Sequence, residues 1–327
     1  MHIKFIDYLC DPITKEKLDI DLSRSKVENG ICKEGFLYSN SNSYPIKKGV
    51  VRFVDNYNYS ESFGWQWNYW SRVQFDSENI NKPMHGHTTK MWESITDFKN
   101  KGINDLNSKV VLDVGCGPGR FIEVVRNKGA LVIGLDYSMA VDAAYRNFEN
   151  DENVCIIQGD AMNLPVKANS IDIAFSIGVL HHTPNPSNGV QEVYKVLKPN
   201  GGWFALSVYG SGGYYDFPSV QFWRKVFAFT WKYLGQWPPL IYTYFVITVF
   251  RPFAKLSRNL GRVIRLFFPF INLPDKDWSL LDTFDSVTPS YQSAHGSYEI
   301  YCWFKAIGYN NIEPTNWGNT SYCGSKK

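Results

Sequence analysis

Hydrophobic and polar positions follow a new pattern from residue 109 onward, where short apolar runs begin to alternate with helical periodicity. These runs are bounded by polar or turn residues, which is typical of buried strands. They are residues 110–114, 131–135, 154–157, 171–177 and 203–208. Strands that alternate with helices favour a parallel sheet with helices on both faces. We therefore predict an α/β fold with a doubly wound sheet.

Helical periodicity lies between the predicted strands. Phe121 and Val124 share one face of a predicted helix that ends near Gly129. A further helical pattern ends at "KPNGG", residues 198–202. The regular alternation then stops, and it resumes with a predicted helix at 298–307 and two short terminal strands. The pattern therefore predicts a long insertion between the fifth strand and the last helix.

Composition sets limits on the partners and the compartment. A net charge of +3 over 327 residues gives no reason to expect a nucleic-acid partner. None of the six cysteines forms a Cys-x-x-Cys pair, which suits a reducing cytosol better than a disulfide framework. The N-terminal sequence has no apolar run long enough for a signal peptide. We expect a cytoplasmic location.

The first predicted strand runs directly into a glycine-rich turn, "VVLDVGCGPGRF". Gly115, Gly117 and Gly119 lie where ligands bind in such sheets, at the carboxyl end of a strand. A dinucleotide-binding turn needs a glycine at the sixth position, where Arg120 stands instead. Asp113, two residues before the first glycine, disfavours a pyrophosphate and suits an ammonium group. A nicotinamide cofactor is therefore disfavoured.

Two further carboxylates follow the next predicted strands. Asp136 ends the second strand, where it is placed to accept hydrogen bonds from a ribose diol. Asp160, in "GDAMNLP", follows the third strand, where it is placed to accept from an adenine amino group. Ribose hydroxyls, an ammonium group and no phosphate describe S-adenosylmethionine. We therefore predict this molecule as the cofactor.

These motifs together resemble the class I S-adenosylmethionine-dependent methyltransferases of the methyltransferase type 11-like kind. The likeness covers residues 109–208 and rests on "LDVGCGPGR", "GLDYS", "GDAMNLPVKANSIDIAFSIGVLHH" and "LKPNGG". It implies a Rossmann-like seven-stranded sheet whose last strand is antiparallel. It also implies cofactor contacts. They are Gly115, Gly117 and Gly119 under the methionine part, Asp136 at the ribose, Asp160 and Ala161 at the adenine, and Ile177 and Gly178 along the sulfonium.

The N-terminal residues resemble a small zinc-ribbon-like module that precedes some bacterial methyltransferases. In that module two Cys-x-x-Cys pairs hold the metal. Here Cys10 is present, but Ile13 stands at its partner position, and Tyr38 and Ser41 lie near the second pair. A structural zinc site needs about four ligands. We expect a degenerate, metal-free module held by its own small core.

Residues 61–70, "ESFGWQWNYW", resemble a segment of methyltransferases from bacterial polysaccharide and natural-product gene clusters. In those proteins the segment helps to close over the cofactor. The resemblance makes Trp65 and Gln66, with Trp67, candidate cofactor contacts. The alternative is that these aromatic side chains anchor the N-terminal module.

Together, these patterns and resemblances predict five segments along the chain. They are a degenerate zinc-ribbon-like module at 1–55, an N-terminal helical cap at 56–108, an S-adenosylmethionine-binding Rossmann-like core at 109–208, a mainly helical aromatic and basic lid insertion at 209–296, and a C-terminal helix with strands that complete the sheet at 297–327.

Transfer of a methyl group to a hydroxyl also requires a base. His181 and His182 follow the fourth predicted strand, next to the expected position of the sulfonium. An unperturbed imidazole titrates near pH 6.5, which suits a base at neutral pH. The alternative is that one histidine packs in the core and the other faces water. Further side chains lie in segments expected to cover the strand ends. The candidate substrate contacts are Tyr209, Tyr214, Tyr215, Asp285, Tyr291 and His295.

The insertion has an unusual charge. Residues 217–274 contain eight basic side chains and no acidic one, so the rest of the chain is net negative. The run "LIYTYFVITVF" within it is too short to span a bilayer, which needs about 20 residues. Basic and aromatic residues together fit helices that lie in a membrane interface. The alternatives are a soluble aromatic lid and a site that attracts a phosphate-bearing acceptor.

The sequence therefore predicts an S-adenosylmethionine-dependent methyltransferase (EC 2.1.1.-) that acts on a hydroxyl of a small-molecule or lipid-linked acceptor. Its location would be cytoplasmic, with peripheral contact to the inner membrane face through residues 217–274 as one alternative. A non-catalytic S-adenosylmethionine-binding partner protein, or an N- or C-methyltransferase of the same fold, is the alternative function.

Overall fold

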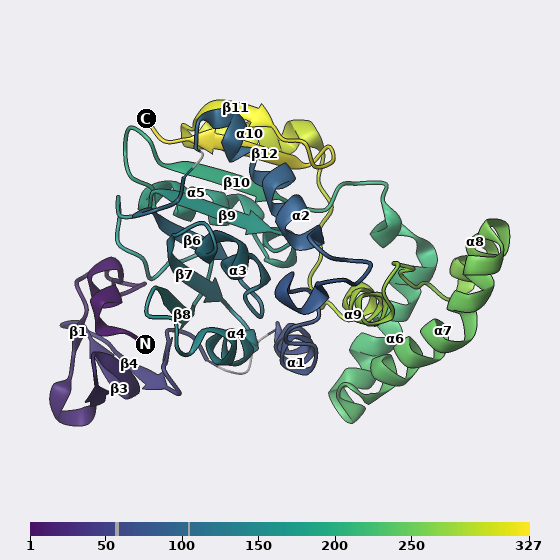
Figure 1. Ribbon diagram of the computed structural model, residues 1–327, viewed down its shortest axis with the longest axis horizontal. Coiled ribbons are helices and arrows are strands. Elements are labelled where there is room, and N and C mark those ends of the chain that lie inside the picture. The colour runs from purple at the N-terminus through teal and green to yellow at the C-terminus, as the bar shows by residue number, and fades with distance from the viewer. Residues whose placement is uncertain (56–58, 104) are drawn as a thin grey trace.

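The computed structural model describes residues 1–55, 59–103 and 105–327, so the predicted helical cap at 56–108 lies partly outside the described residues. One mixed sheet runs through the molecule (Figure 1). Seven strands at its centre follow the order β8-β7-β6-β9-β10-β12-β11. They are β6 (Val110–Val114), β7 (Leu131–Asp136), β8 (Val154–Gln158), β9 (Ile173–Ile177), β10 (Trp203–Ser207), β11 (Asn310–Pro314) and β12 (Ser321–Ser325).

The pairing of these strands confirms the predicted fold class. Strands β6 to β10 pair in parallel, and β12 pairs antiparallel with both β10 and β11. Alternate residues of β6 enter different cores, with Leu112 and Val114 on one face and Val111 on the other. Successive side chains of a strand point to opposite faces, so the continuous apolar run follows from burial on both faces.

The N-terminal residues extend the same sheet instead of forming a separate unit. Strand β5 (Val50–Arg52) pairs in parallel with β8, and it connects β4 (Ser43–Lys47) and β3 (Ile31–Tyr38) to the centre. Phe5 and Leu9 belong to the same hydrophobic cluster as Leu112. The expectation that this module has its own small core is therefore wrong. Two short strands complete its edge, β1 (Asp19–Ile20) and β2 (Lys26–Glu28).

A carboxylate, Asp11, joins the segment after Cys10 to the turn and strand at residues 39–44. Asp11 accepts hydrogen bonds from the hydroxyls of Ser39 and Tyr44, at 2.6 and 2.9 Å, and from the Asn42 amide at 2.9 Å. The amide of Ile13 donates to the same carboxylate at 2.8 Å. Burial alone would raise the pKa of Asp11, but these donors bring it well below its usual range. Hydrogen bonds thus supply cross-links that resemble those of a metal.

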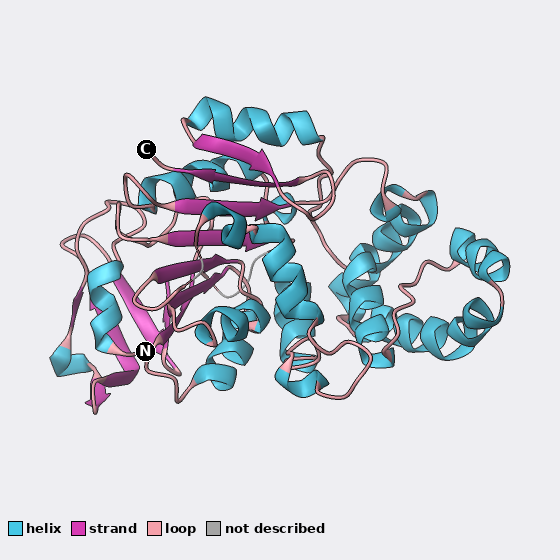
Figure 2. Ribbon diagram, turned by 45° about the horizontal axis from the view of Figure 1, so that its top comes forward, coloured by secondary structure: helices cyan, strands magenta, loops and turns pink. Residues whose placement is uncertain are grey.

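Helices cover both faces of the sheet (Figure 2). One face packs on α5 (Pro186–Val196) and α10 (Ser297–Ile307), which contact each other. The other face packs on three helices that precede or alternate with the central strands. They are α2 (His87–Thr96), α3 (Arg120–Arg126) and α4 (Ala140–Phe148). Helix α1 (Glu61–Tyr69) packs on α4.

The insertion forms a third, helical core that projects from the sheet on the side away from the N-terminal strands (Figure 1). Its helices are α6 (Pro218–Leu234), α7 (Trp237–Leu256), α8 (Arg258–Phe267) and α9 (Lys276–Val287). Helix α9 packs on α6, α7 and α1, so it connects the projecting helices to the sheet. Within the described residues, no helix combines the length and apolarity needed to cross a membrane.

Candidate functional site

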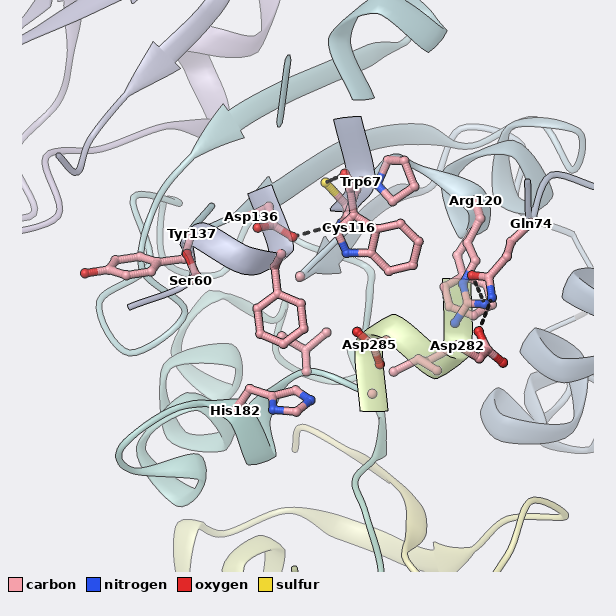
Figure 3. Close-up of a pocket in the computed structure, with 18 of the residues that line it drawn as sticks. Ser60, Trp67, Gln74, Cys116, Arg120, Asp136, Tyr137, His182, Asp282 and Asp285 are labelled. Atoms are coloured by element: carbon pink, nitrogen blue, oxygen red, sulfur yellow. Dashed lines mark hydrogen bonds between the residues drawn. The ribbon is translucent and has the colours of Figure 1, made fainter. Parts of the chain in front are cut away.

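A cavity of about 390 Å³ opens at the carboxyl ends of the central parallel strands. This size lies within the usual range for small-molecule sites, roughly 300–1,000 Å³. Residues directly after β6, β7, β8, β9 and β10 contribute to its wall, and α1, α2 and α9 close the opposite side. Figure 3 shows Asp136 and Tyr137 at one end of the group of side chains and Arg120, Gln74 and Asp282 at the other.

The glycine turn after β6 requires glycine because of its backbone and its close neighbours. Gly115 has a φ of +86°, and a Cβ at that position would lie 2.3 Å from Val179. Gly117 has a φ of +53° and lies against the indole of Trp67. Both line the cavity, as predicted. Gly119 instead lies at the start of α3 and faces Phe148. It shapes the turn but is not part of the cavity wall among the described residues.

Two of the three predicted carboxylates line the cavity. Asp136 accepts from the Gly117 amide at 2.9 Å and from the Ser138 amide and hydroxyl at 2.8 and 2.7 Å, so it also holds the glycine turn. Asp160 accepts from the Met162 amide at 2.8 Å. Burial raises the pKa of both carboxyls, against the lowering effect of these donors. Each carboxylate keeps acceptor capacity for a ligand hydroxyl or amino group.

The third carboxylate lies deeper. Asp113 is 1% exposed, and it is not among the described residues that line the cavity. Its Oδ2 has no hydrogen-bond partner among the side chains and backbone of the described chain. Burial, together with the nearby Asp136, raises its pKa well above the usual range. Asp113 therefore lies outside the wall that the described residues form, and its contact with an ammonium group stays a prediction.

The predicted positions after β8 and β9 also reach the cavity. Ala161, Ile177 and Gly178 are in its wall. Gly178 has a φ of +74°, and no described atom lies within 4 Å of the position that a Cβ would take. The backbone here leaves open space on the cavity side, which suits the close approach of a ligand.

The aromatic segment of α1 contributes in part. Trp67 lines the cavity. Trp65 instead stacks on Tyr69, with ring centroids 4.8 Å apart, and belongs to the helical core. Gln66 is fully buried and donates to Asp285 at 2.7 Å. Trp67 is thus part of the cavity wall, whereas Trp65 and Gln66 pack behind the wall that the described residues form.

The two histidines differ in position. Residues Leu180–His182 form a short 3-10 turn, in which adjacent side chains point in different directions. His182 lines the cavity, and its Nδ1 lies 2.7 Å from the Tyr291 carbonyl oxygen. His181 has no exposed surface, and its ring lies between those of His182 and Tyr209. Neither ring nitrogen of His181 has a partner within the described part of the chain.

Burial lowers the pKa of His182 to about 4, and the neighbouring Arg224 guanidinium adds to this effect. The expectation of a titration near pH 6.5 is therefore wrong. Because a carbonyl oxygen only accepts, the Nδ1 atom of neutral His182 carries the proton and Nε2 keeps its lone pair.

The predicted substrate contacts divide in the same way. Tyr209 and Tyr215 line the cavity and stack with ring centroids 4.1 Å apart, and Asp285 lies across from them. The other three lie outside the wall that the described residues form. Tyr291 accepts from His182 through its backbone, Tyr214 packs on Tyr215 and Phe217, and His295 contacts Ser293 and Glu299 at 2.8 and 3.0 Å.

A polar cluster that the sequence reasoning missed occupies the end of the cavity away from Asp136 (Figure 3). The Arg120 guanidinium donates to the Gln74 side chain at 2.5 Å, and Gln74 donates to Asp282 at 3.0 Å. Asp285 lies one turn further along α9. Burial and the proximity of Asp285 raise the pKa of Asp282 to about 7. The available signal was the i,i+3 spacing of two aspartates, Asp282 and Asp285, among the buried side chains of α9.

Part of the cavity wall lies in a stretch of sequence with known relatives. Residues 112–205 match the family described as "Methyltransferase domain". This stretch is a methyltransferase domain. Within the described residues, no group of three or more His, Cys, Asp or Glu side chains is arranged to hold a metal ion.

The methyltransferase domain is similar to parts of longer proteins. Sterol 24-C-methyltransferase of Saccharomyces cerevisiae is 38% identical over 104 residues, which cover 30% of this chain and 26% of that protein. Demethylmenaquinone methyltransferase of Corynebacterium kroppenstedtii is 29% identical over 121 residues, 37% of this chain and 50% of that protein. The chain spans between about a quarter and a half of the length of such curated relatives.

Among solved structures, an S-adenosylmethionine-dependent methyltransferase from Mesorhizobium loti is similar over the same region. It is 27% identical with a TM-score of 0.33, and the match covers 38% of this chain and 55% of that one.

Proposed function

We propose that this protein transfers a methyl group from S-adenosylmethionine to a hydroxyl of a small-molecule or lipid-linked acceptor. One observation carries the proposal: a single cavity joins two separate sets of polar groups. We assign Asp136 and Asp160 to the donor, and Arg120, Asp282 and Asp285 form a second polar set in the same cavity, with Arg120 and Asp282 at the end away from Asp136 (Figure 3). A protein that only binds S-adenosylmethionine has no need of the second set.

The donor end of the cavity fits S-adenosylmethionine. Gly178 leaves open space at the wall, and Asp136 and Asp160 offer acceptors to a diol and an amino group. No cluster of lysines or arginines, of the kind a pyrophosphate requires, stands at this end among the described residues. When bound, S-adenosylmethionine supplies a methyl group already activated by its sulfonium, so the chain mainly has to align the acceptor.

We assign the proton acceptor to His182. Its Nδ1 proton is held by the Tyr291 carbonyl, so Nε2 is the ring atom that accepts a hydrogen bond from an acceptor hydroxyl. As the acceptor oxygen forms its bond to the methyl carbon, the hydroxyl proton passes to Nε2 and then to water. A pKa of about 4 makes His182 a weak base that is neutral throughout the physiological range, so orientation is the larger part of its effect. His181 supports its ring from behind.

The polar cluster at the far end indicates an acceptor with several hydroxyl groups. Carboxylates, amides and a guanidinium offer both donors and acceptors, and the aromatic rings of Trp67, Tyr209 and Tyr215 offer apolar faces. This combination suits a sugar ring, which presents hydroxyls at its edge and C–H groups on its faces. Among the relatives, one name specifies methylation at carbon, 24-C-, so a carbon acceptor is the alternative to be tested.

The first test measures ligand binding and transfer together. We expect calorimetry to detect binding of S-adenosylmethionine and of S-adenosylhomocysteine but not of NAD. With methyl-labelled donor and a panel of glycosides, amines and sterols, we expect label on glycosides. Label only on amines or only on carbon would overturn the hydroxyl assignment. Donor binding without transfer to any of the acceptors, from the panel or from a cell extract, would favour the non-catalytic alternative.

Asp282→Asn is expected to stabilise the protein at pH 8 more than at pH 5. The folded protein holds the Asp282 proton up to a pKa of about 7, whereas the unfolded chain loses it near pH 4. The unfolded state therefore binds fewer protons, and stability falls as the pH rises between these values. Asparagine keeps the contact with Gln74 and never ionises, so the variant should gain about 1–3 kcal/mol at pH 8.

Thermal unfolding at the two pH values measures this difference, with Asp277→Asn as the control. Asp277 lies on the same helix and is exposed. The interpretation fails if Asp282→Asn changes stability equally at both pH values, or if the control shows the same trend.

A further inference from the structure

Helix α7 presents a continuous apolar face to solvent. Six large apolar side chains recur every three or four residues along its 20 residues, which places them on one side of the helix. They are 38% to 84% exposed. These side chains are Trp237, Ile241, Phe245, Val249, Phe253 and Leu256.

The neighbouring helices α6 and α8 also expose apolar side chains, with positive charge beside them on α6 and on the opposite side of α8. On α6, exposed Phe222 and Phe229 lie seven residues apart, and exposed Lys225 and Lys232 follow the same spacing next to them. On α8, Leu260, Val263 and Phe267 are exposed on the side opposite Arg258 and Arg262. We call the exposed side chains of α6, α7 and α8 the docking face.

The exposed apolar side chains concentrate in this part of the molecule. Of the 25 large hydrophobic side chains that are exposed in the described chain, 16 lie between Phe217 and Phe267. Single exposed apolar residues are normal on a monomer, but runs that follow helical spacing mark an interaction surface. The third core already fills the inner sides of these helices, so the outer faces are not needed for folding.

The charge of the docking face selects its partner. Five of the eight basic side chains of residues 217–274 are exposed. They are Lys225, Lys232, Lys255, Arg258 and Arg262. The other three are engaged inside, for example Arg224 with the Ser286 carbonyl at 2.8 Å and Arg251 with the Leu273 carbonyl at 2.8 Å. With no acidic residue in the segment, a second copy of this chain would meet like charges across such an interface.

We propose that the docking face binds an anionic lipid surface, with α7 lying in the plane of the headgroups. The apolar side chains enter the boundary between headgroups and acyl chains, and the lysines and arginines contact lipid phosphates. This is an in-plane contact, since none of the helices in the described ranges is suited to crossing the bilayer.

The proposed contact has a consequence for the cavity. Helix α9 packs against α6 and α7, and it carries Asp282 and Asp285 into the cavity. The helices proposed to contact the lipid, α6 and α7, therefore also pack against the helix that carries the polar side chains at the acceptor end of the cavity. The docking itself does not depend on methyl transfer, so its test can fail or succeed independently.

Cosedimentation with vesicles tests the proposal. We expect the full chain to bind vesicles of equal parts phosphatidylglycerol and phosphatidylcholine, and to bind phosphatidylcholine alone at least about tenfold more weakly, because anionic lipid supplies the attraction. Ile241→Ser with Phe245→Ser and Phe253→Ser should lower binding at least about tenfold. The matched control, Ile13→Ser with Leu22→Ser and Ile80→Ser, changes side chains that are equally exposed but lie elsewhere, and should bind normally.

A second pair of variants tests the charges. Lys225→Gln with Lys232→Gln and Arg262→Gln should weaken binding to the anionic vesicles, whereas Lys47→Gln with Lys82→Gln and Lys305→Gln should not. Binding should also weaken with added salt, because screening shortens the attraction to about 8 Å at physiological ionic strength. Failure to bind either vesicle overturns the proposal, as does equal loss in variant and control. Self-association that the apolar variant abolishes, without vesicle binding, would assign the face to a second copy.

Discussion

Gly115→Ala is expected to lower the affinity for S-adenosylmethionine by at least about 100-fold, because it displaces the turn that faces the ligand. The φ of +86° at Gly115 is one that residues with a side chain rarely adopt, and the new Cβ would lie 2.3 to 2.7 Å from three atoms of Val179. Val179 adjoins Gly178 in the cavity wall, so the collision moves two parts of the donor site at once. Calorimetry with S-adenosylmethionine measures the loss.

Two further variants separate the effect on the ligand from an effect on folding. Gly30 has a φ of +73° and no described atom within 4 Å of a Cβ, so Gly30→Ala carries the backbone strain without a collision. It should lower the unfolding temperature but leave ligand affinity unchanged. Gly178 has a φ of +74°, so Gly178→Ala should lower the unfolding temperature about as much as Gly30→Ala does. Because its Cβ also enters the cavity, it should weaken the ligand as well. Normal affinity in both Gly115→Ala and Gly178→Ala would contradict the assigned donor site.

His182→Gln is expected to lower turnover by about 100-fold while the affinity for S-adenosylmethionine is nearly kept. The glutamine lacks the ring nitrogen that faces the acceptor hydroxyl. The contact between Nδ1 and the Tyr291 carbonyl orients the ring and also joins the turn after β9 to the segment that leads from α9 to α10. His182→Asn keeps a donor close to that carbonyl, so the asparagine variant should retain the thermal stability of the parent and still be slow.

The pH profile gives an independent reading of the same residue. Burial lowers the pKa of His182 to about 4, so the residue stays neutral above about pH 5. The titration of His182 should therefore cause no change in turnover between pH 8 and about pH 5. In His182→Gln, any fall below pH 5 that belongs to this imidazole should disappear. A fall centred near pH 6.5 in the parent that the substitution removes would show an exposed histidine instead. Full activity in both His182 variants would rule out the assigned role.

Much of the central fold could be predicted because its signals are local. The apolar runs at 110–114 and 131–135 became β6 and β7 at nearly the same bounds, since a strand buried on both faces must be continuously apolar. The glycine turn and Asp136 lie within a few residues of those strands, and parallel strands bring their carboxyl ends to one edge. The donor end of the cavity therefore follows from short segments, each of which lies next to the strand that positions it.

The acceptor end depended on contacts between distant segments. Gln74, Arg120 and Asp282 come from a loop, a helix start and the insertion, and each is an ordinary polar residue in its own sequence context. Adjacent histidines looked equivalent along the chain, but the 3-10 turn directs one into the core and the other into the cavity. Sequence periodicity states which face of an element is buried. It does not state which partner covers that face.

The N-terminal residues show the same division. The sequence shows Ile13 at the position where the resembling module has the partner of Cys10, which predicts that no zinc site is present. Only the tertiary structure decided how these loops are joined, because Asp11 contacts Ser39 and Tyr44 through a chain reversal of about thirty residues. It also decided that β5 adds to β8, since an exposed strand edge accepts any strand whose backbone groups and apolar faces match.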